Sequence, residues 1–260
     1  MRGYRWGIVI IALTTVLGAA CAPRQIKPVA ATDPAPLLNA VRMRESILER
    51  GLSGTLELAY KNGRERFKGS VYIVAYPDGR FRLEVPAPLG GTFLVMTSDS
   101  KEILAFYPGR NSAFRSEVDG RSINPYLPFP LPLDPGVLPA LIMGVLPAED
   151  TAVKAQAWLM DSGEKLLRVI PDGKDLQFDY LFDAELKERI RKITARGRDL
   201  QISLRIGPGP DQLPADFELL LPEGALSGQW DSVAPFIGEK ASLVLRIPDS
   251  VTITDLEALP

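Results

Sequence analysis

The sequence predicts a mainly β domain: a single curved antiparallel sheet, open as a half-barrel, with helices forming a lid on its concave side. From Leu52 onward, short runs of alternating apolar and polar residues follow one another, with turn residues between them, as in an antiparallel meander. Only two segments, 34–50 and 136–146, have the pattern of helices. A twisted sheet of about ten strands tends to curl, so these helices are expected on its concave side.

The first helix is expected to have Asp33 as its N-cap and Pro34 at its first helical position, where proline is favoured. Gly51 would end it. A broken apolar stripe is formed by Leu37, Leu38, Val41, Ile47 and Leu48. The other side carries Arg42, Arg44, Glu45, Glu49 and Arg50.

Strand patterns follow the first helix and resume after the second one. The first group covers 53–60, 66–76, 80–85, 92–97, 102–107 and, more weakly, 112–118. The second group covers 165–170, 176–182, 189–195, 200–206, 216–221 and 241–247. In 92–97 and 102–107 the alternation fades, because Phe93 and Val95 lie on one face while Leu94 and Met96 lie on the other. These two strands are therefore predicted to be covered on both faces.

The second helix carries no charged residue at all. A helix that is apolar on all sides is buried in protein or covers an apolar cavity. With a hollow beneath it, the lack of buried charge would suit acyl chains, because apolar burial needs no polar partner. The candidates for cavity or lid are Phe93, Val95, Leu104, Phe106, Leu138, Leu141, Ile142 and Met143. The alternative is that both helices pack tightly against the sheet and leave no cavity.

The N-terminus has the pattern of a bacterial lipoprotein signal. Arg2 and Arg5 precede an apolar run over 6–20, which ends in small residues directly before Cys21. The sequence thus predicts a signal peptide over 1–20, lipid on Cys21, an extended tether over 21–32 and one domain over 33–260. Secretion without lipid is the alternative. Since Ala22 follows the cysteine rather than Asp, we expect anchoring in the outer membrane, facing the periplasm.

The composition excludes several kinds of function. There is no histidine, and Cys21 is the only cysteine, so nucleophilic triads and histidine-based metal sites are excluded. No catalytic residue, metal or cofactor is therefore expected. Removing Arg2 and Arg5 from the 30 basic residues leaves 28 against 32 acidic ones, a net charge of −4, which argues against nucleic acid as a partner. A monomer is expected.

Two stretches resemble the lipoprotein receptor family LolB. Residues 80–95, RFRLEVPAPLGGTFLV, are similar to a strand Arg-x-Arg-Leu that runs into Asn-Pro-Leu-Gly and a second strand. Residues 138–147, LPALIMGVLP, look like that family's Leu-x-x-Trp-Ile-x-Gly-Leu-Pro helix. The likeness covers about two thirds of the mature chain. Ala87 replaces the usual Asn, and Ala140 and Leu141 stand where the Trp is expected.

The resemblance implies a half-barrel with a helical lid over an acyl-binding cavity. It also implies that the protein accepts lipoproteins from a periplasmic LolA-like carrier and helps insert them into the outer membrane. The implied partners are lipoprotein acyl chains, that carrier and outer-membrane lipid. By motif, the leucine that this family uses for membrane insertion falls on Leu89, although a turn leucine can also fold back onto the sheet.

A second hypothesis is a structural or assembly lipoprotein with a filled core. It would bind envelope proteins through its sheet edges or through a loop over 226–240, in which Trp230 and Phe236 are expected to be exposed. The absence of extractable lipid would distinguish it from the first hypothesis.

Overall fold

The computed structural model describes residues 27–63, 65–117, 138–146, 153–172, 175–186, 188–222, 224–238, 243 and 245–256. The predicted signal peptide and Cys21 lie outside these residues, as do Gly136 and Val137 of the second predicted helix. Within the described ranges, no helix is long and apolar enough to cross a bilayer. No three His, Cys, Asp or Glu side chains of these ranges form a group that could hold a metal ion.

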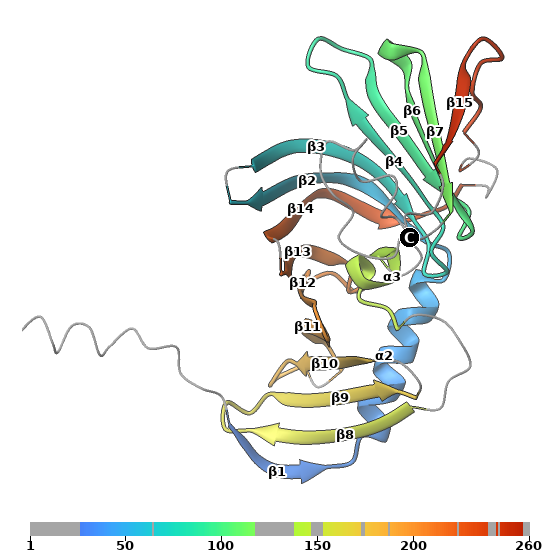
Figure 1. The fold of residues 1–260 in the computed structure, drawn as a ribbon. Coiled ribbons are helices and arrows are strands. Elements are labelled where there is room, and N and C mark those ends of the chain that lie inside the picture. Colours follow the sequence, from blue (N-terminus) through green and yellow to red (C-terminus); the bar gives the residue numbers. More distant parts are fainter. Residues whose placement is uncertain are drawn as a thin grey trace, which may run out of the picture.

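The strands of the described chain form a single 15-stranded sheet in the order β1-β8-β9-β10-β11-β12-β13-β14-β2-β3-β4-β5-β6-β7-β15. One meander consists of β2 (Leu52–Asn62), β3 (Glu65–Ala75), β4 (Phe81–Pro86), β5 (Thr92–Ser98), β6 (Glu102–Tyr107) and β7 (Ser112–Glu117). The other consists of β8 (Val153–Met160), β9 (Lys165–Pro171), β10 (Leu176–Phe182), β11 (Ile190–Gly197), β12 (Gln201–Ile206), β13 (Pro214–Leu221) and β14 (Gly224–Pro235). The sheet curves into an open arc, as predicted (Figure 1).

Strand β14 joins the two meanders, because it pairs with β13 on one side and with β2 on the other. The prediction of an exposed loop over 226–240 is therefore wrong. Trp230 is buried in the core, and the half-buried Phe236 packs edge-to-face on Tyr76 at 5.9 Å. The sequence did not predict this strand because the alternation of apolar residues is interrupted at Gly228. This glycine occupies an inward position, where a Cβ would lie 2.4 Å from the Phe217 ring.

The C-terminal segment crosses the face of the sheet opposite the helices. Residues 243 and 245–247 form no strand there, against the prediction for 241–247. Leu243 instead packs against Val74 and Tyr76, and Val251 packs against Phe106 and Ala113. The chain then adds β15 (Thr252–Leu256), which pairs with β7 in parallel. One edge pair of the predicted antiparallel sheet is thus parallel.

The other edge is β1 (Pro28–Thr32), which pairs with β8. The sequence predicts an extended tether through this segment, and the structure uses its extended backbone to continue the sheet. The chain therefore enters the domain at Pro28 rather than at Asp33.

Both helices lie on the concave side of the arc (Figure 1). Helix α2 (Ala35–Leu48) begins one residue later than expected, with Pro34 as N-cap, while the Asp33 carboxylate accepts a hydrogen bond from the Ala35 N–H at 3.0 Å. After this helix, Gly51 has φ +87° and donates its N–H to the Leu48 carbonyl. Helix α3 (Leu138–Met143) covers the centre of the arc. The main core consists of side chains from both helices and from the concave face of the sheet.

Candidate functional site

A wholly apolar pocket lies between α3 and the concave face of the sheet. Its described lining comes from α3 and from six strands: Leu56, Leu58, Ile73, Phe81, Leu83, Met96, Leu138, Pro139, Ile142, Phe217 and Leu226. Its volume is about 40 Å³. Small-molecule pockets occupy about 300–1,000 Å³. A fatty chain therefore fits here only if α3 moves away from the sheet.

Helix α3 ends in a tight C-terminal turn. The Val145 N–H bonds to the Ala140 carbonyl at 2.9 Å and the Gly144 N–H to the Leu141 carbonyl at 3.0 Å, which is the Schellman pattern. Gly144 takes φ +65°, and a Cβ there would lie 2.6 Å from Cδ1 of Ile193. Glycine is thus required both by the turn and by the close approach to the sheet.

Arg44 of α2 binds the end of α3. Its Nη1 donates to the Gly144 carbonyl at 2.7 Å, its Nη2 to the Met143 carbonyl at 2.6 Å and its Nε to the Gln212 carbonyl at 2.9 Å. The side chain is only 1% exposed. Burial lowers the pKa of Arg44 to about 10, so it stays charged at neutral pH. A cation is favourable at the C-terminal carbonyls of a helix.

Glu45, the next residue of α2, adds a second contact. Its carboxylate accepts the Leu146 N–H at 2.9 Å, and burial raises the pKa of this carboxyl above its ordinary value. Arg44 is thus buried and Glu45 half-buried, so the prediction that both belong to the charged side of this helix, away from its apolar stripe, is wrong. The helix instead turns Met43 and Ile47 outward, with exposed fractions of 68% and 37%.

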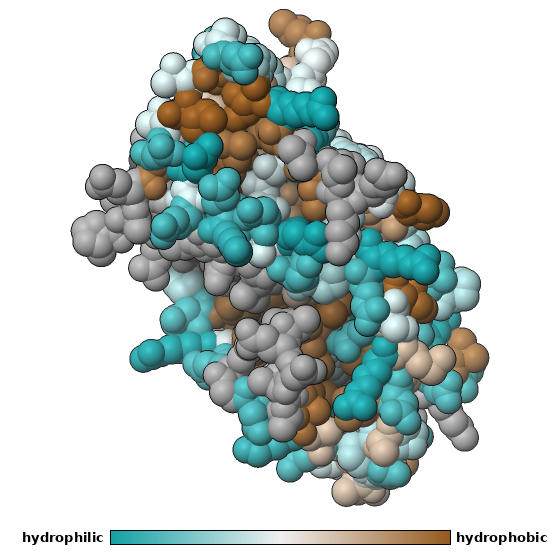
Figure 2. All heavy atoms as spheres, turned by 90° about the vertical axis from the view of Figure 1, so that its right-hand side faces the viewer, coloured by the Kyte–Doolittle hydropathy of each residue, from teal (hydrophilic) through white to brown (hydrophobic). Residues whose placement is uncertain are grey.

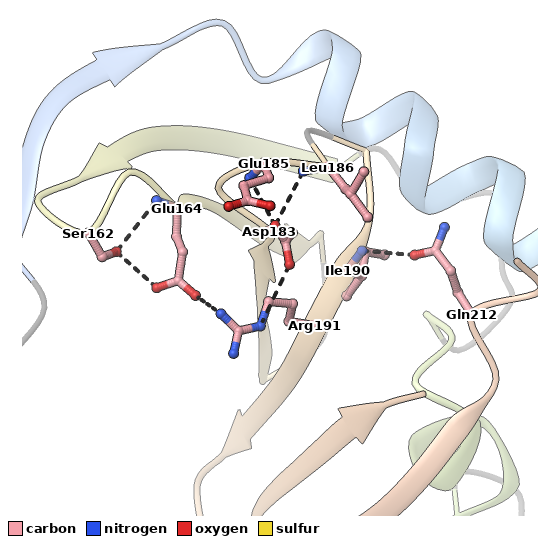
Figure 3. A network of polar contacts seen from close by, with 8 residues as sticks. All are labelled: Ser162, Glu164, Asp183, Glu185, Leu186, Ile190, Arg191 and Gln212. Carbon is pink, nitrogen blue, oxygen red and sulfur yellow. Dashed lines mark hydrogen bonds and ion pairs between the residues drawn. The ribbon is translucent and has the colours of Figure 1, made fainter. Parts of the chain in front are cut away.

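A polar network lies near this contact, at the start of β11 and in the β10–β11 loop (Figure 3). Gln212 accepts the Ile190 N–H on its side-chain oxygen at 2.8 Å, while its carbonyl accepts Arg44. Gln212 has φ +48°, a conformation that a non-glycine residue keeps only when its surroundings fix it. In the same network, the guanidinium of Arg191 lies 2.7 Å from the carboxylate of Glu164 and 4.0 Å from that of Asp183. The network thus fixes the β10–β11 loop and the carbonyl that holds Arg44.

The predicted cavity candidates separate into two groups. Leu138 and Ile142 line the pocket, and Leu141 and Met143 are buried in the surrounding core. Phe93 is half-buried against the same core, 5.4 Å from the Tyr107 ring. An irregular register between β4 and β5, where Leu94 pairs with Val85 and Thr92 with Pro86, turns Phe93 inward, as β-bulges do.

Val95, Leu104 and Phe106 lie on the opposite face of the sheet. Phe106 packs on Val251, Leu104 lines the same surface pocket as Leu243 and Leu245, and Val95 pairs with Phe106. These three residues do not line the pocket, which corrects the prediction. The expectation that β5 and β6 are covered on both faces is confirmed. The C-terminal segment covers the face opposite the helices.

Leu89 lies at the tip of the β4–β5 loop, which projects from the end of the sheet (Figure 1). Its side chain is fully exposed and does not fold back. Gly90 and Gly91 have φ +95° and +82°, and a Cβ on either would meet nothing within 4 Å. The loop therefore presents an isolated leucine to its surroundings.

Apolar residues also reach the surface on the open side of the sheet. Figure 2 shows an upper patch at the level of β5–β7 and a lower furrow at the level of α2, each bordered by hydrophilic residues. The half-buried rings of Phe93 and Phe114 flank Tyr107 on the concave side of these upper strands. Apolar surface is thus present beside the helices as well as beneath them.

Neither the comparison with protein-family models nor the comparison with curated proteins finds a match. Solved structures do match. A domain named as an outer membrane lipoprotein-sorting protein, from Vibrio parahaemolyticus, has a TM-score of 0.50 and 12% identity, over 81% of this chain and 97% of that one. A DUF1329 family protein from Desulfovibrio piger also has a TM-score of 0.50 and 12% identity, over 82% and 100% of the two chains.

A LolA superfamily protein from Nitrosomonas europaea has a TM-score of 0.49 and 6% identity, over 80% of this chain and 97% of that one. At these identities a likeness concerns the fold alone. The chain thus shares the fold of the Vibrio parahaemolyticus domain, in agreement with the fold that the LolB resemblance of its sequence implies.

Proposed function

We propose that this protein is a lipid-anchored acceptor for acylated proteins in the bacterial envelope, which takes up acyl chains beneath α3 and helps insert its cargo into the outer membrane. The observation that carries the proposal is the wholly apolar pocket closed by α3. The fold shared with a lipoprotein-sorting domain supports the same role. Lipid on Cys21, donated cargo from a LolA-like carrier and attachment to the outer membrane are parts of this proposal.

The energies of opening and filling are comparable. Lifting α3 breaks the bonds from Arg44 to Met143 and Gly144 and the bond from Leu146 to Glu45. Hydrogen bonds to charged groups contribute about 1.5–3 kcal/mol each. Burial of one CH₂ group contributes about 0.8 kcal/mol, so roughly ten buried CH₂ groups offset all three bonds. A single buried acyl chain would therefore offset the loss of these three bonds.

Leu89 suits a transient contact with a bilayer. Full burial of one leucine side chain contributes about 2 kcal/mol, too little for stable attachment. A brief insertion of the loop tip would still bring the domain to the membrane surface while the lipid on Cys21 holds the protein nearby.

The test compares uptake with delivery. Full-length protein receives a fluorescent diacylated lipoprotein and is then mixed with phospholipid vesicles. Leu89→Glu should take up as much cargo as the wild type and deliver little of it. Leu186→Glu, on the half-exposed leucine of the β10–β11 loop, is the matched control and should deliver normally. Equal delivery by wild type and Leu89→Glu would remove Leu89 from the mechanism.

A structural or assembly role is the second candidate, favoured by the small volume of the pocket. Its partners would pair with the sheet edges at β1 and β15, which are mostly exposed. Organic extraction of the purified protein separates the two roles, because a purely structural protein would release no lipid beyond its own anchor.

A further inference from the structure

Within the described ranges, the buried hydroxyl group of Tyr180 has no hydrogen-bond partner. Tyr180 lies on β10, its ring stacks on Phe178 at 6.4 Å, and its side chain is 0% exposed. Among the described residues, nothing forms a hydrogen bond with its hydroxyl. Native proteins leave few buried polar groups unpaired, because each one costs free energy, and each one calls for a reason.

Tyr180 lies on the strand beside the one that contacts the end of α3. Tyr180 pairs across the sheet with Ile193 of β11, the residue that approaches Gly144 most closely. The hydroxyl also interacts electrostatically with the Arg44 guanidinium and with the Glu45 carboxyl. Two hydrogen-bond donors, one charged and one neutral, therefore share the buried region under the end of α3.

Movement of α3 would free most of the hydrogen-bonding capacity of Arg44 beside the Tyr180 hydroxyl. Arg44 would lose the Met143 and Gly144 carbonyls and would keep only the Gln212 carbonyl. Glu45 is a poor replacement, because neighbouring residues on a helix do not face each other. The open site then consists of a guanidinium and a phenol beside an apolar pocket.

We propose that Tyr180 and Arg44 form a carbonyl-binding site for the ester groups of a diacyl lipid whose chains enter the pocket. The inference rests on the proposed function and adds the chemical class of the cargo. Arg44 already binds three carbonyl oxygens in the closed state, the same kind of atom that an acyl ester offers. A neutral ester also enters a buried site at a far smaller desolvation penalty than a phosphate or a carboxylate.

The experiment compares ester-linked and ether-linked lipids, which differ in the carbonyl group. Full-length protein is placed in nanodiscs of dialkyl-ether phosphatidylcholine. It is offered photoreactive diacylglyceryl lipopeptide or photoreactive phosphatidylethanolamine, each in an ester and an ether form, and the labelled protein is measured. The variants are Tyr180→Phe and the control Tyr60→Phe, which removes a hydroxyl from a buried tyrosine of the same core.

Wild type and Tyr60→Phe should prefer the ester by about tenfold, the effect of one or two hydrogen bonds. Tyr180→Phe should show a clearly smaller ester preference, because only Arg44 still binds an ester carbonyl. It should bind the ether form as the wild type does and unfold at the same temperature or a higher one. Preference in the lipopeptide arm alone identifies acylated protein as the source of the ester. Preference in both arms extends the site to any diacyl lipid.

Three results would overturn the inference. They are an ester preference that is undiminished in Tyr180→Phe, a wild type without any preference, and a Tyr180→Phe variant that loses ether uptake and thermal stability together. Uptake of ether lipid by the wild type would leave the proposed function standing in each case. If neither form labels the wild type, the proposed function itself fails.

Discussion

The guanidinium of Arg44 lies 2.7 Å from the carbonyl oxygen of Gly144, and so a side chain of α2 binds the last turn of α3. The two residues are 100 positions apart in the sequence. Because α3 also covers the apolar pocket, this contact links the position of the lid to one buried charge. The state of the lid thus depends on Arg44.

Replacement of Arg44 tests this dependence. Arg44→Met leaves the Met143, Gly144 and Gln212 carbonyls without their donor, so the free energy of unfolding should fall by about 3 kcal/mol. Hydrogen exchange at the Gly144 and Val145 amides should accelerate. Arg42→Met, which removes the same charge from an exposed position of α2, is the control. Matching exchange rates in the two variants would contradict the role of Arg44.

Gly144 should tolerate no side chain. Gly144→Ala places a Cβ 2.6 Å from Cδ1 of Ile193 at φ +65°, which should destabilise the protein by roughly 2 kcal/mol. Trimming the neighbour in Gly144→Ala/Ile193→Val should recover part of the loss. Gly109→Ala, in open space, should change little. Denaturant unfolding of the four proteins measures these differences, and a neutral Gly144→Ala would refute the close contact.

Glu45 should give a measurable pH dependence. Burial raises the pKa of this carboxyl in the folded state above its ordinary value of 4.5, so the folded protein binds its proton more tightly than the unfolded chain. Stability from this group is therefore present at low pH and declines as the pH rises from 4.5 through the folded-state pKa. Glu45→Gln keeps an oxygen acceptor for Leu146 and should lack this decline.

The relevant quantity is the difference in unfolding free energy between wild type and Glu45→Gln, measured across pH 4 to 8. This difference cancels the titration of the other carboxyl groups. Glu45→Gln should become the more stable protein toward neutral pH. A difference that stays constant with pH would show that the carboxyl is not buried as described.

The pairing of β14 with β2 should depend on Gly54 of β2. At Gly54 a Cβ would lie 2.0 Å from the Ser232 carbonyl oxygen, inside the pairing that joins the two meanders. Gly54→Ala should therefore lower the free energy of unfolding by about 3 kcal/mol and expose Trp230 on the adjacent segment. Trp fluorescence during denaturant unfolding reports both effects, and an unchanged midpoint would argue against this close approach.

Much of the fold could be predicted because the alternation of apolar residues reports which strands are half-buried. The segment 80–85 was expected as a strand and corresponds to β4, and 176–182 corresponds to β10. Strand β14 escaped because Gly228 removes one apolar position from its inner face. The parallel strand β15 was not predicted because its pairing depends on the path of the C-terminal segment over the face of the sheet opposite the helices.

The site was less predictable. The alternation of side chains along a strand places Val95 and Phe106 on one face of the sheet. It does not say which face of the sheet contains the pocket. Arg44 was assigned to the solvent side of its helix, because charge is expected there unless a partner is known. Its partners are backbone carbonyls of Met143, Gly144 and Gln212, which no residue type reveals. Leu89 was located from its position in the LolB-like stretch 80–95.

The most direct measurement maps where an acyl chain lies in the full-length protein. A lipopeptide whose palmitoyl chains end in a diazirine is incubated with the protein in nanodiscs and irradiated, and mass spectrometry identifies the labelled residues. The account predicts labels on pocket-lining residues, including Leu83, Met96 and Ile142. Labels confined to the exposed surface, with none beneath α3, would contradict it.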